Sequence, residues 1–400
     1  MPAVCMYFEA HQPWRLRTMS PSASPERGYF DYPDNAAILN KVASKCYVPT
    51  NRALKRLVER HDGRFRIAFA MTGTLIEQMR HWSRETLQSF EELIATGSVE
   101  LVGETDYHSL AALFDPGDFR AQVELHMARM ESLFGQRPTV FRNTELIYNE
   151  QIGEMVEAMG FKAMLAEGAD DVLAGRSPNF VYHRPGGALR LLLKNYRLSD
   201  DIAFRFSNRA WADYPLTADK FASWVHGMAG DGEVVNLFMD YETFGEHQWA
   251  DSGIFDFLDH LPSEILRHED FEFLTPSQVV ERYEPVGEMA FPRTVSWADE
   301  ARDLSAWQGN RLQRSALKRC YALGPEVRRR NNPTTTEIWR RLQTSDHFYY
   351  MSTKGFADGD VHAYFSPYPG PYDAFLNYMH ALHDFTTRVL GLPEPEPEHT

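Results

Sequence analysis

The sequence predicts an α/β fold of consecutive strand–helix units, followed by a region that contains helices only. Up to about residue 291, short apolar runs alternate with segments of helical periodicity, which is typical of parallel strands joined by helices. From residue 292 onward, apolar residues recur at spacings of three and four, as on one face of a helix. A chain of 400 residues with 43% hydrophobic content can bury one barrel-sized domain with an appendage, or two ordinary domains.

Seven apolar runs in the first region are predicted to be strands. In chain order they are Val4–Phe8, Arg66–Ala70, Val99–Gly103, Val140–Asn143, Ala163–Ala166, Leu189–Leu193 and Val234–Met239. An eighth run, Phe271–Leu274, is predicted either to complete a ring of strands or to lie outside it. Two intervening helices are predicted at Phe119–Leu133 and Asn149–Met159, and Gly160 is expected to cap the second at its C-terminal end.

The second region is predicted to be helical and to pack on the first. Its helices are expected at Leu304–Leu323, Pro333–Thr344 and Tyr372–Leu390. The predicted division is therefore a catalytic barrel domain at 1–291 and a helical domain at 292–390. Residues 391–400 are rich in Pro and Glu and are predicted to be a disordered acidic tail.

Composition excludes several classes of partner. The net charge is −15, from 41 Lys and Arg against 56 Asp and Glu, which disfavours nucleic acid and anionic membranes as partners. No apolar run approaches the roughly 18 residues of a membrane helix, and the N-terminus lacks the pattern of a leader, so we expect a cytoplasmic protein. The three cysteines, Cys5, Cys46 and Cys320, have spacings that indicate neither a disulfide framework nor a zinc cluster.

Two predicted strands end in carboxylates. Glu145 follows Val140–Asn143, and Asp240 follows Val234–Met239. The carboxyl ends of barrel strands meet at one mouth, and retaining glycosidases hold two carboxyl groups there roughly 5–5.5 Å apart. A single acid at a strand end is more often a surface or capping residue, but two such acids favour a catalytic pair. Neighbouring acids such as Glu242 are expected to raise the pKa of Asp240, which suits a proton donor.

Other chemistries have weaker support in the sequence. No G-x-S-x-G, P-loop or G-x-G-x-x-G motif occurs, so serine hydrolase, nucleotidase and dinucleotide-binding functions are not indicated. Several potential metal ligands are present, but none has the spacing of a metal motif, so neither a metal nor another cofactor is predicted. These ligands are His11, Asp240, His247 and His362. Asp201 is expected to form an ion pair with Arg205, four residues further on.

Five motifs resemble those of glycoside hydrolase family 57, in particular its short α-amylase-type members. They follow one another between Tyr7 and about Asp384, nearly the whole chain. In order they are His11-Gln12-Pro13, Gly97-Ser98-Val99-Glu100-Leu101-Val102, Asn143-Thr144-Glu145, Asp240-Tyr241-Glu242 and Asp303-Leu304-Ser305-Ala306-Trp307-Gln308-Gly309-Asn310. The resemblance implies an incomplete seven-stranded (β/α) barrel with a C-terminal helical domain that contributes to the site, retention of configuration, and no required metal.

The resemblance also implies individual roles. Glu145 would be the nucleophile and Asp240 the acid/base. The residues expected to bind substrate are His11, Glu100, Glu242, Asp303 and Trp307, together with His247 and Trp249 after the fourth motif. Trp297 is a further candidate for stacking on a sugar ring. At the second motif the strand-end argument points to Glu104 rather than Glu100, and Glu9 departs from the first motif by adding an acid.

The predicted function is hydrolysis of α-1,4 linkages in α-glucans by double displacement, with an α-glucan or maltooligosaccharide as the substrate. The same carboxylates could serve a 4-α-glucanotransferase or a branching enzyme of the same family. A non-catalytic glucan-binding protein and a metal-dependent carbohydrate deacetylase are alternatives from other classes. Chain-length preference and oligomeric state are left open by the sequence.

Overall fold

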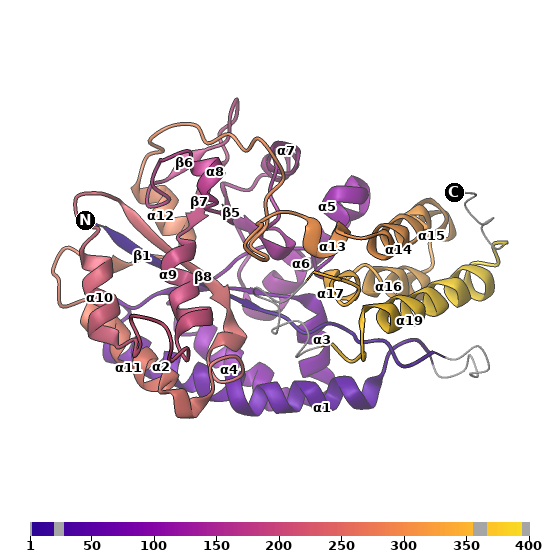
Figure 1. The fold of residues 1–400 in the computed structure, drawn as a ribbon, viewed down its shortest axis with the longest axis horizontal. Coiled ribbons are helices and arrows are strands. Elements are labelled where there is room, and N and C mark those ends of the chain that lie inside the picture. Colours follow the sequence, from indigo (N-terminus) through magenta and orange to yellow (C-terminus); the bar gives the residue numbers. More distant parts are fainter. Residues whose placement is uncertain (1, 20–27, 355–365, 394–400) are drawn as a thin grey trace.

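The computed structural model describes residues 2–19, 28–354 and 366–393. Parallel strands lie at the centre of the molecule and helices lie outside them (Figure 1). One sheet has the order β3-β2-β1-β8, and the other has the order β4-β5-β7-β6. The strands are β1 (Ala3–Ala10), β2 (Ile67–Met71), β3 (Val99–Leu101), β4 (Val140–Arg142), β5 (Ala163–Glu167), β6 (Tyr182–His183), β7 (Arg190–Lys194), β8 (Val234–Asp240) and β9 (Glu272–Phe273).

The two sheets are joined into an incomplete barrel. A parallel bridge between Gly103 and Phe141 connects the end of β3 to β4. On the other side, the Asn195 amide donates to the Asn236 carbonyl at 2.9 Å, which ties the end of β7 to β8. The seven predicted strands are therefore the parallel strands of this ring, and the predicted fold class is confirmed. Strand β9 is parallel to β1 but lies off the path of the sheet, while β6 is an antiparallel edge strand.

The strands are apolar because helices cover them. All eight residues of β1 are buried, as expected for a parallel strand with both faces packed. The covering helices are α1 (Tyr32–Val42), α2 (Val48–Arg60), α3 (Gly73–Trp82), α4 (Arg84–Ile94), α5 (Ala111–Phe114), α6 (Pro116–Phe134), α7 (Glu150–Ala158), α8 (Asp170–Leu173), α9 (Tyr196–Asp200), α10 (Ala218–His226), α11 (Ile254–Ile265) and α12 (Pro276–Arg282). The two predicted helices are α6 and α7, and Gly160 follows α7 with a φ of +88°.

The C-terminal helices lie on one side of the barrel (Figure 1). They are α13 (Ser305–Gln308), α14 (Arg311–Ala322), α15 (Gly324–Arg330), α16 (Pro333–Arg341), α17 (Ser345–Tyr349) and α19 (Pro371–Asp384), which continues as a π-helix at Phe385–Val389. The predicted helix Leu304–Leu323 is divided in two, because Asn310 caps α14 in a capping box with Gln313. Trp339 and Tyr378 share one hydrophobic core with Phe119 and Phe141 of the barrel side.

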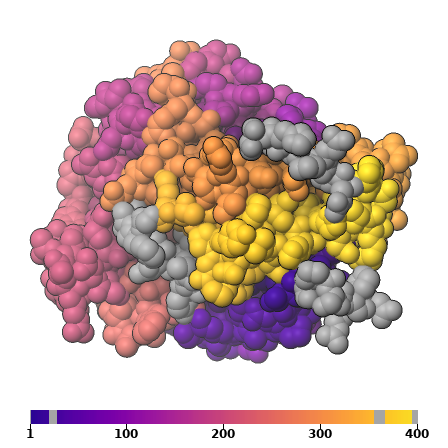
Figure 2. All heavy atoms as spheres, turned by 45° about the vertical axis from the view of Figure 1, so that its right-hand side comes forward, coloured from indigo at the N-terminus to yellow at the C-terminus, as the bar shows by residue number. Residues whose placement is uncertain are grey.

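The C-terminal helices also contact the N-terminal segment. Figure 2 shows the yellow C-terminal residues between the orange segment before them and the indigo start of the chain. Tyr29 donates a hydrogen bond to Asp384 at 2.6 Å, and the Asn377 side chain bonds the backbone of both Arg17 and Met19. The predicted acidic tail and His362 fall largely or wholly outside the described residues. No helix in the described part combines the length and apolar character needed to cross a bilayer.

Candidate active site

Glu145 and Asp240 line one cavity at the carboxyl ends of the strands. The cavity holds about 360 Å³ of space, and His247 and Trp297 also line it. Glu145 lies in the turn Thr144–Leu146 that follows β4, and Asp240 is the last residue of β8. The parallel pairing of β1 and β8 puts Asp240 opposite Glu9, so three acids from three strands lie at the same end of the barrel. This is the end at which parallel barrels carry their active sites.

The backbone at Glu145 is in an unusual conformation. Glu145 has a φ of +59° and Leu146 a φ of +50°, in the left-handed region that non-glycine residues rarely adopt. The turn is held from both sides, because Leu146 donates to the Asn143 carbonyl and Trp297 donates to the Glu145 carbonyl. Such conformations concentrate at functional sites, where surrounding contacts compensate for their cost of about 1–3 kcal/mol. The turn therefore fixes the Glu145 side chain.

Both carboxylate oxygens of Glu145 accept hydrogen bonds. The Trp297 indole donates to Oε2 at 2.8 Å, and the Ser345 hydroxyl donates to Oε1 at 2.9 Å. His108 Nε2 lies 3.4 Å from Oε1. Burial raises the pKa of Glu145, but the hydrogen bond and charge of His108, together with the charge of Arg142, outweigh burial and lower the pKa to about 2. Glu145 is therefore ionised at neutral pH, as a carboxylate nucleophile must be.

Asp240 experiences the opposite shift. Burial raises the pKa of Asp240, and the charges of Glu145 and Glu9 add to the effect, so that the pKa reaches about 7. Arg142 and Lys194 oppose this shift only in part. Asp240 can therefore hold a proton near neutral pH beside an ionised carboxylate. Two acids whose environments separate their pKa values in this way are suited to the roles of nucleophile and proton donor.

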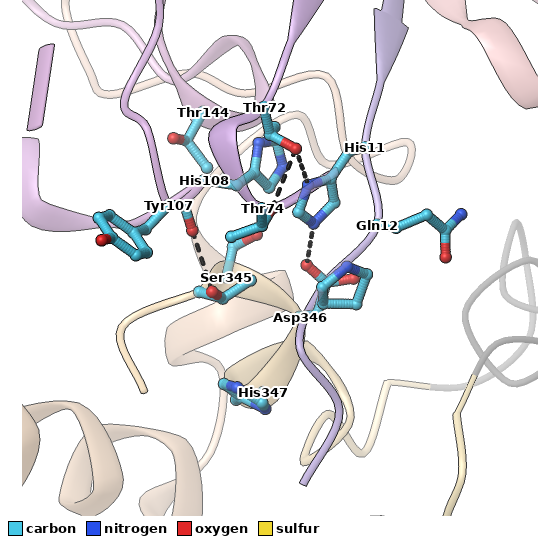
Figure 3. Close-up of polar contacts among 12 residues, drawn as sticks. His11, Gln12, Thr72, Thr74, Tyr107, His108, Thr144, Ser345, Asp346 and His347 are labelled. Atoms are coloured by element: carbon cyan, nitrogen blue, oxygen red, sulfur yellow. Dashed lines mark hydrogen bonds and ion pairs between the residues drawn. The ribbon is translucent and has the colours of Figure 1, made fainter. Parts of the chain in front are cut away.

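His11 lies beside this pair in a hydrogen-bonded cluster (Figure 3). Its Nδ1 is 3.0 Å from the Thr72 hydroxyl, and its Nε2 is 3.0 Å from Asp346 Oδ2. The ring stacks on His108 with centroids 4.0 Å apart. Burial and the charge of His108 lower the pKa of His11 despite the opposing charge of Asp346. His11 is therefore neutral at pH 7, and its ring is held by Thr72, the N-cap residue of α3, and by Asp346 of α17.

Glu242 lies next to the cavity but does not line it. Its side chain is buried and accepts a hydrogen bond from the Tyr47 hydroxyl. Burial and the charge of Asp240 raise the pKa of Glu242 to about 8. Asp201, for which an ion pair with Arg205 was predicted, forms that pair at 2.6 Å, which confirms the prediction.

Three residues expected to bind substrate do not line this cavity. Trp307 is fully buried in the hydrophobic core, because α13 turns its apolar side inward next to Tyr349. Asp303 binds the backbone amide of Ser305 at the start of α13 and does not line the cavity. Trp249 is 57% exposed and also lies off the cavity wall. The tryptophan that contacts the site is Trp297, whose side chain bonds Glu145 directly.

Glu100 is also placed away from the carboxylate pair. Its side chain accepts a hydrogen bond from the Ser277 amide at 2.9 Å, at the start of α12. Glu100 pairs with Ala68, which pairs with Tyr7, so Glu100 lies two positions before the level of Glu9, deeper in the barrel than the site. The acid that joins the site cluster is Glu104, whose Oε2 lies 3.3 Å from His108 Nδ1. The strand-end argument, which pointed to Glu104, agrees with this placement.

Replacing Glu100 with glutamine is expected to leave turnover within about threefold of the wild type, because the carboxylate contacts the start of α12 rather than substrate. Replacement with alanine should lower the free energy of unfolding by about 1–3 kcal/mol, because the Ser277 amide would lose its buried acceptor. Initial rates on a maltooligosaccharide and chemical unfolding curves measure the two effects. A hundredfold loss of turnover in Glu100→Gln would place this carboxylate at the substrate instead.

Several site residues were not found by sequence reasoning. His108 lies in a turn after β3, and Ser345 and Asp346 begin α17, some 200 residues after Glu145. Arg142 is a fully buried cation inside a predicted apolar strand, 3.2 Å from Glu9. The one usable signal was Arg142 itself, since a charge in the middle of a buried strand requires a partner. The other three belong to no motif spacing.

Two groups of side chains among the described residues could in principle hold a metal ion. They are His11 with His108 and Asp346, and Glu9 with Glu104 and His108. In the first group the two rings are stacked at an interplanar angle of only 22°, so their in-plane lone pairs do not converge on one point. In the second group Arg142 already supplies a positive charge at 3.2 Å from Glu9. The arrangement favours hydrogen-bonded and ionic roles for these side chains.

Comparison with known proteins gives consistent matches. The sequence model of a family described as Glycosyl hydrolase family 57 matches residues 5–292. A protein of Methanocaldococcus jannaschii, provisionally named alpha-amylase, is 44% identical, and the alignment covers 94% of this chain and 83% of that protein.

Solved structures show the same fold. The 4-alpha-glucanotransferase of Thermococcus litoralis matches with a TM-score of 0.68 at 16% identity, over 95% of this chain and 59% of the other. This chain thus spans less than two thirds of that protein. A branching enzyme of Pyrococcus horikoshii matches with a TM-score of 0.67 at 13% identity, over 99% of this chain and 98% of the other. At these identities the likeness concerns the fold alone.

Proposed function

The chain belongs to glycosyl hydrolase family 57 and is a glycoside hydrolase, and from that premise we propose that it cleaves α-1,4 linkages of α-glucans with retention of configuration. Glu145 is the nucleophile and Asp240 the acid/base in this proposal. The observation that carries it is the opposite shift of two carboxyl groups on one cavity wall, with the pKa of Glu145 at about 2 and that of Asp240 at about 7.

The first step forms a glycosyl-enzyme. Glu145 attacks the anomeric carbon, and the bond from that carbon to the glycosidic oxygen breaks. Asp240 gives its proton to the departing oxygen. The negative charge of Glu145 disappears as the ester forms, while Asp240 becomes a carboxylate. The indole of Trp297 and the hydroxyl of Ser345 hold the nucleophile in place during the attack.

The second step releases the sugar. Asp240, now ionised, takes a proton from water, and the water oxygen attacks the anomeric carbon. The ester bond breaks and its electron pair returns to Glu145. Two inversions at one carbon give net retention. The cavity also presents aromatic side chains, Phe204, Trp297 and Tyr349, whose faces or edges can contact the apolar surfaces of sugar rings.

The pH dependence of kcat/KM is a prediction of this assignment. The rate should fall tenfold per pH unit above about 7, because Asp240 loses the proton that it must donate. On the acid side the rate should stay flat through pH of about 4.3, where a free glutamate titrates, because the pKa of Glu145 is held at about 2. Initial rates on a maltooligosaccharide between pH 3 and 9 measure both limbs. A decline that begins near the ordinary glutamate pKa would contradict the role given to Glu145.

Product analysis tests the reaction class. Maltoheptaose is incubated with wild type and Glu145→Gln, with and without a chelator, and the products are separated by chromatography. Shorter oligosaccharides that disappear in the variant and are indifferent to the chelator support hydrolysis. Products longer than maltoheptaose would show transfer to a sugar hydroxyl. Binding without any products would indicate a glucan-binding protein, and chelator-sensitive chemistry would indicate a deacetylase-like enzyme.

A further inference from the structure

His108 is held rigidly beside the nucleophile. It is 3% exposed and has a φ of +50°. Its amide donates to the Thr105 carbonyl at 3.0 Å, and its own carbonyl accepts a hydrogen bond from the Ser345 amide at 2.9 Å. The turn after β3 is therefore fixed both by its own chain and by the first residue of α17. The same Ser345 uses its hydroxyl to bond Glu145, so one residue fixes His108 and the nucleophile together.

The ring of His108 bridges the nucleophile and two buried acids. Its Nε2 lies 3.4 Å from Glu145 Oε1, while its Nδ1 lies 3.3 Å from Glu104 Oε2 and 3.7 Å from Glu9 Oε1. An ionised carboxylate only accepts hydrogen bonds, so simultaneous contacts of Nε2 with ionised Glu145 and of Nδ1 with ionised Glu104 or Glu9 require a proton on both ring nitrogens. The imidazolium form satisfies all three acids at once. His11 covers one face of the ring at 4.0 Å.

The surrounding charges support a permanent positive charge on His108. The titratable and charged groups that face this cluster are Glu9, Glu104, Glu145, Asp240, Asp346, His11 and Arg142. Burial lowers the pKa of His108, but hydrogen bonds to Glu104 and Glu145 and the charges of Glu145 and Glu9 outweigh burial and raise it to about 10. Burial and the charge of Glu9 raise the pKa of Glu104, while the hydrogen bond and the charge of His108 oppose this rise.

We propose that His108 is a positioning residue that stays protonated through the catalytic cycle and makes Glu145 a good leaving group in the second step. This inference rests on the proposed function, because it requires a glycosyl ester on Glu145. When the ester forms, Glu145 loses its charge while His108 keeps its proton and its contacts with Glu104 and Glu9. When the ester breaks, the electron pair returns to an oxygen that already faces an imidazolium.

The two steps should respond differently to loss of this cation. A less basic carboxylate is a weaker nucleophile in the first step but a better leaving group in the second. Removing the positive charge of His108 should therefore slow the second step far more than the first. A role in folding alone would affect both steps alike, so the ratio of the two rates distinguishes positioning from scaffolding.

The test uses His108→Asn with α-maltosyl fluoride, whose fluoride departs without help from an acid. Asparagine tolerates the positive φ of this position. Fluoride release should show a burst of about one equivalent per enzyme, followed by a steady rate lowered about a hundredfold, with KM lowered in parallel because the intermediate accumulates. Mass spectrometry of quenched enzyme should find maltose on the Glu145 peptide. The apparent pKa of the acid limb of kcat/KM should rise toward the ordinary glutamate pKa of about 4.3.

A second variant and a control complete the experiment. Glu104→Gln keeps the side-chain volume but replaces the carboxylate beside His108 Nδ1 with a neutral amide, so it should shift the same quantities in the same direction by a smaller amount. His183→Asn serves as the control. His183 lies on strand β6, and its ring contacts the Arg184 carbonyl rather than a residue of the site. This variant should retain wild-type kinetics. Thermal melting identifies any variant that fails to fold, in which case Glu104→Gln carries the test.

The outcomes separate the two proposals. Equal losses of kcat and kcat/KM in folded His108→Asn and Glu104→Gln, without an intermediate or a shifted acid limb, would overturn the role of His108 while leaving Glu145 as nucleophile. Wild type that releases no fluoride, or Glu145→Gln that keeps wild-type rates, would overturn the proposed function itself. Accumulation of the ester in His108→Asn but not in wild type would support both the role of His108 and the proposed function.

Discussion

Replacing Glu145 with glutamine is expected to lower turnover of maltoheptaose by about 10⁴-fold or more. The amide nitrogen and oxygen of glutamine cannot form the glycosyl ester, because the neutral amide is a very weak nucleophile. The side chain keeps its volume and retains one oxygen that can accept from Trp297 or Ser345. The fold should therefore persist, and binding of maltoheptaose should remain measurable by calorimetry. Initial rates over hours of incubation give the required sensitivity.

The matched control for this variant is Glu100→Gln. Both substitutions remove one partly buried acid on or just after a barrel strand, but Glu100 bonds the start of α12 rather than the site. Activity should vanish in the first variant and persist in the second. A Glu145→Gln enzyme with a tenth or more of wild-type turnover would refute the assignment of the nucleophile. The reverse pattern, loss only in Glu100→Gln, would move the chemistry deeper into the barrel.

Replacing Asp240 with asparagine is expected to lower turnover of maltoheptaose by about 10³–10⁴-fold, the contribution of a positioned acid and base. The loss should depend on the substrate. With α-maltosyl fluoride the first step needs no proton, so the ester on Glu145 should form and then persist, because no base activates water. Azide should speed the release of this ester, since the anion attacks the anomeric carbon without a base.

The product of that rescue is diagnostic. Attack of azide on an ester of Glu145 should give maltosyl azide of the α configuration, which nuclear magnetic resonance distinguishes from the β anomer. The Asp240→Asn substitution should not destabilise the fold, because it removes a buried acid that Glu145 and Glu9 repel. Azide should have no effect on Glu145→Gln, which forms no ester. Failure of azide to act on Asp240→Asn, or a β-azide product, would exclude the proposed acid/base role.

The strands and the proposed catalytic pair were predictable from the sequence because they depend on local patterns. Each parallel strand is buried on both faces, so its sequence is a short run of apolar residues, as in β8. A carboxylate after such a run, as with Asp240, then stands out against the apolar background. The helix α7 was predictable for the same reason, since Asn149 and Gly160 mark its ends by capping chemistry within a few residues.

The remaining site residues depend on contacts between distant segments. Asp346 contacts His11 although the two residues are 335 positions apart, and no spacing in the sequence predicts that contact. Trp307 and Trp297 are both tryptophans near the start of the helical region, and only packing decides that Trp307 enters the core while Trp297 bonds Glu145. Glu100 and Glu104 are only four residues apart, but Glu100 bonds the start of α12 while Glu104 contacts His108. In each of these two pairs, only the packing of the folded chain decides which residue reaches the site.

The contacts made by α17 have a consequence for biosynthesis. Ser345 and Asp346 can reach Glu145 and His11 only after the 200 and 335 positions that separate them have been translated. Loops of this length close late in folding, because their ordering entropy must be offset by many other contacts. A nascent barrel on the ribosome therefore holds Glu145 without the hydroxyl of Ser345. Under the proposed mechanism, catalytic competence is acquired only after α17 has docked.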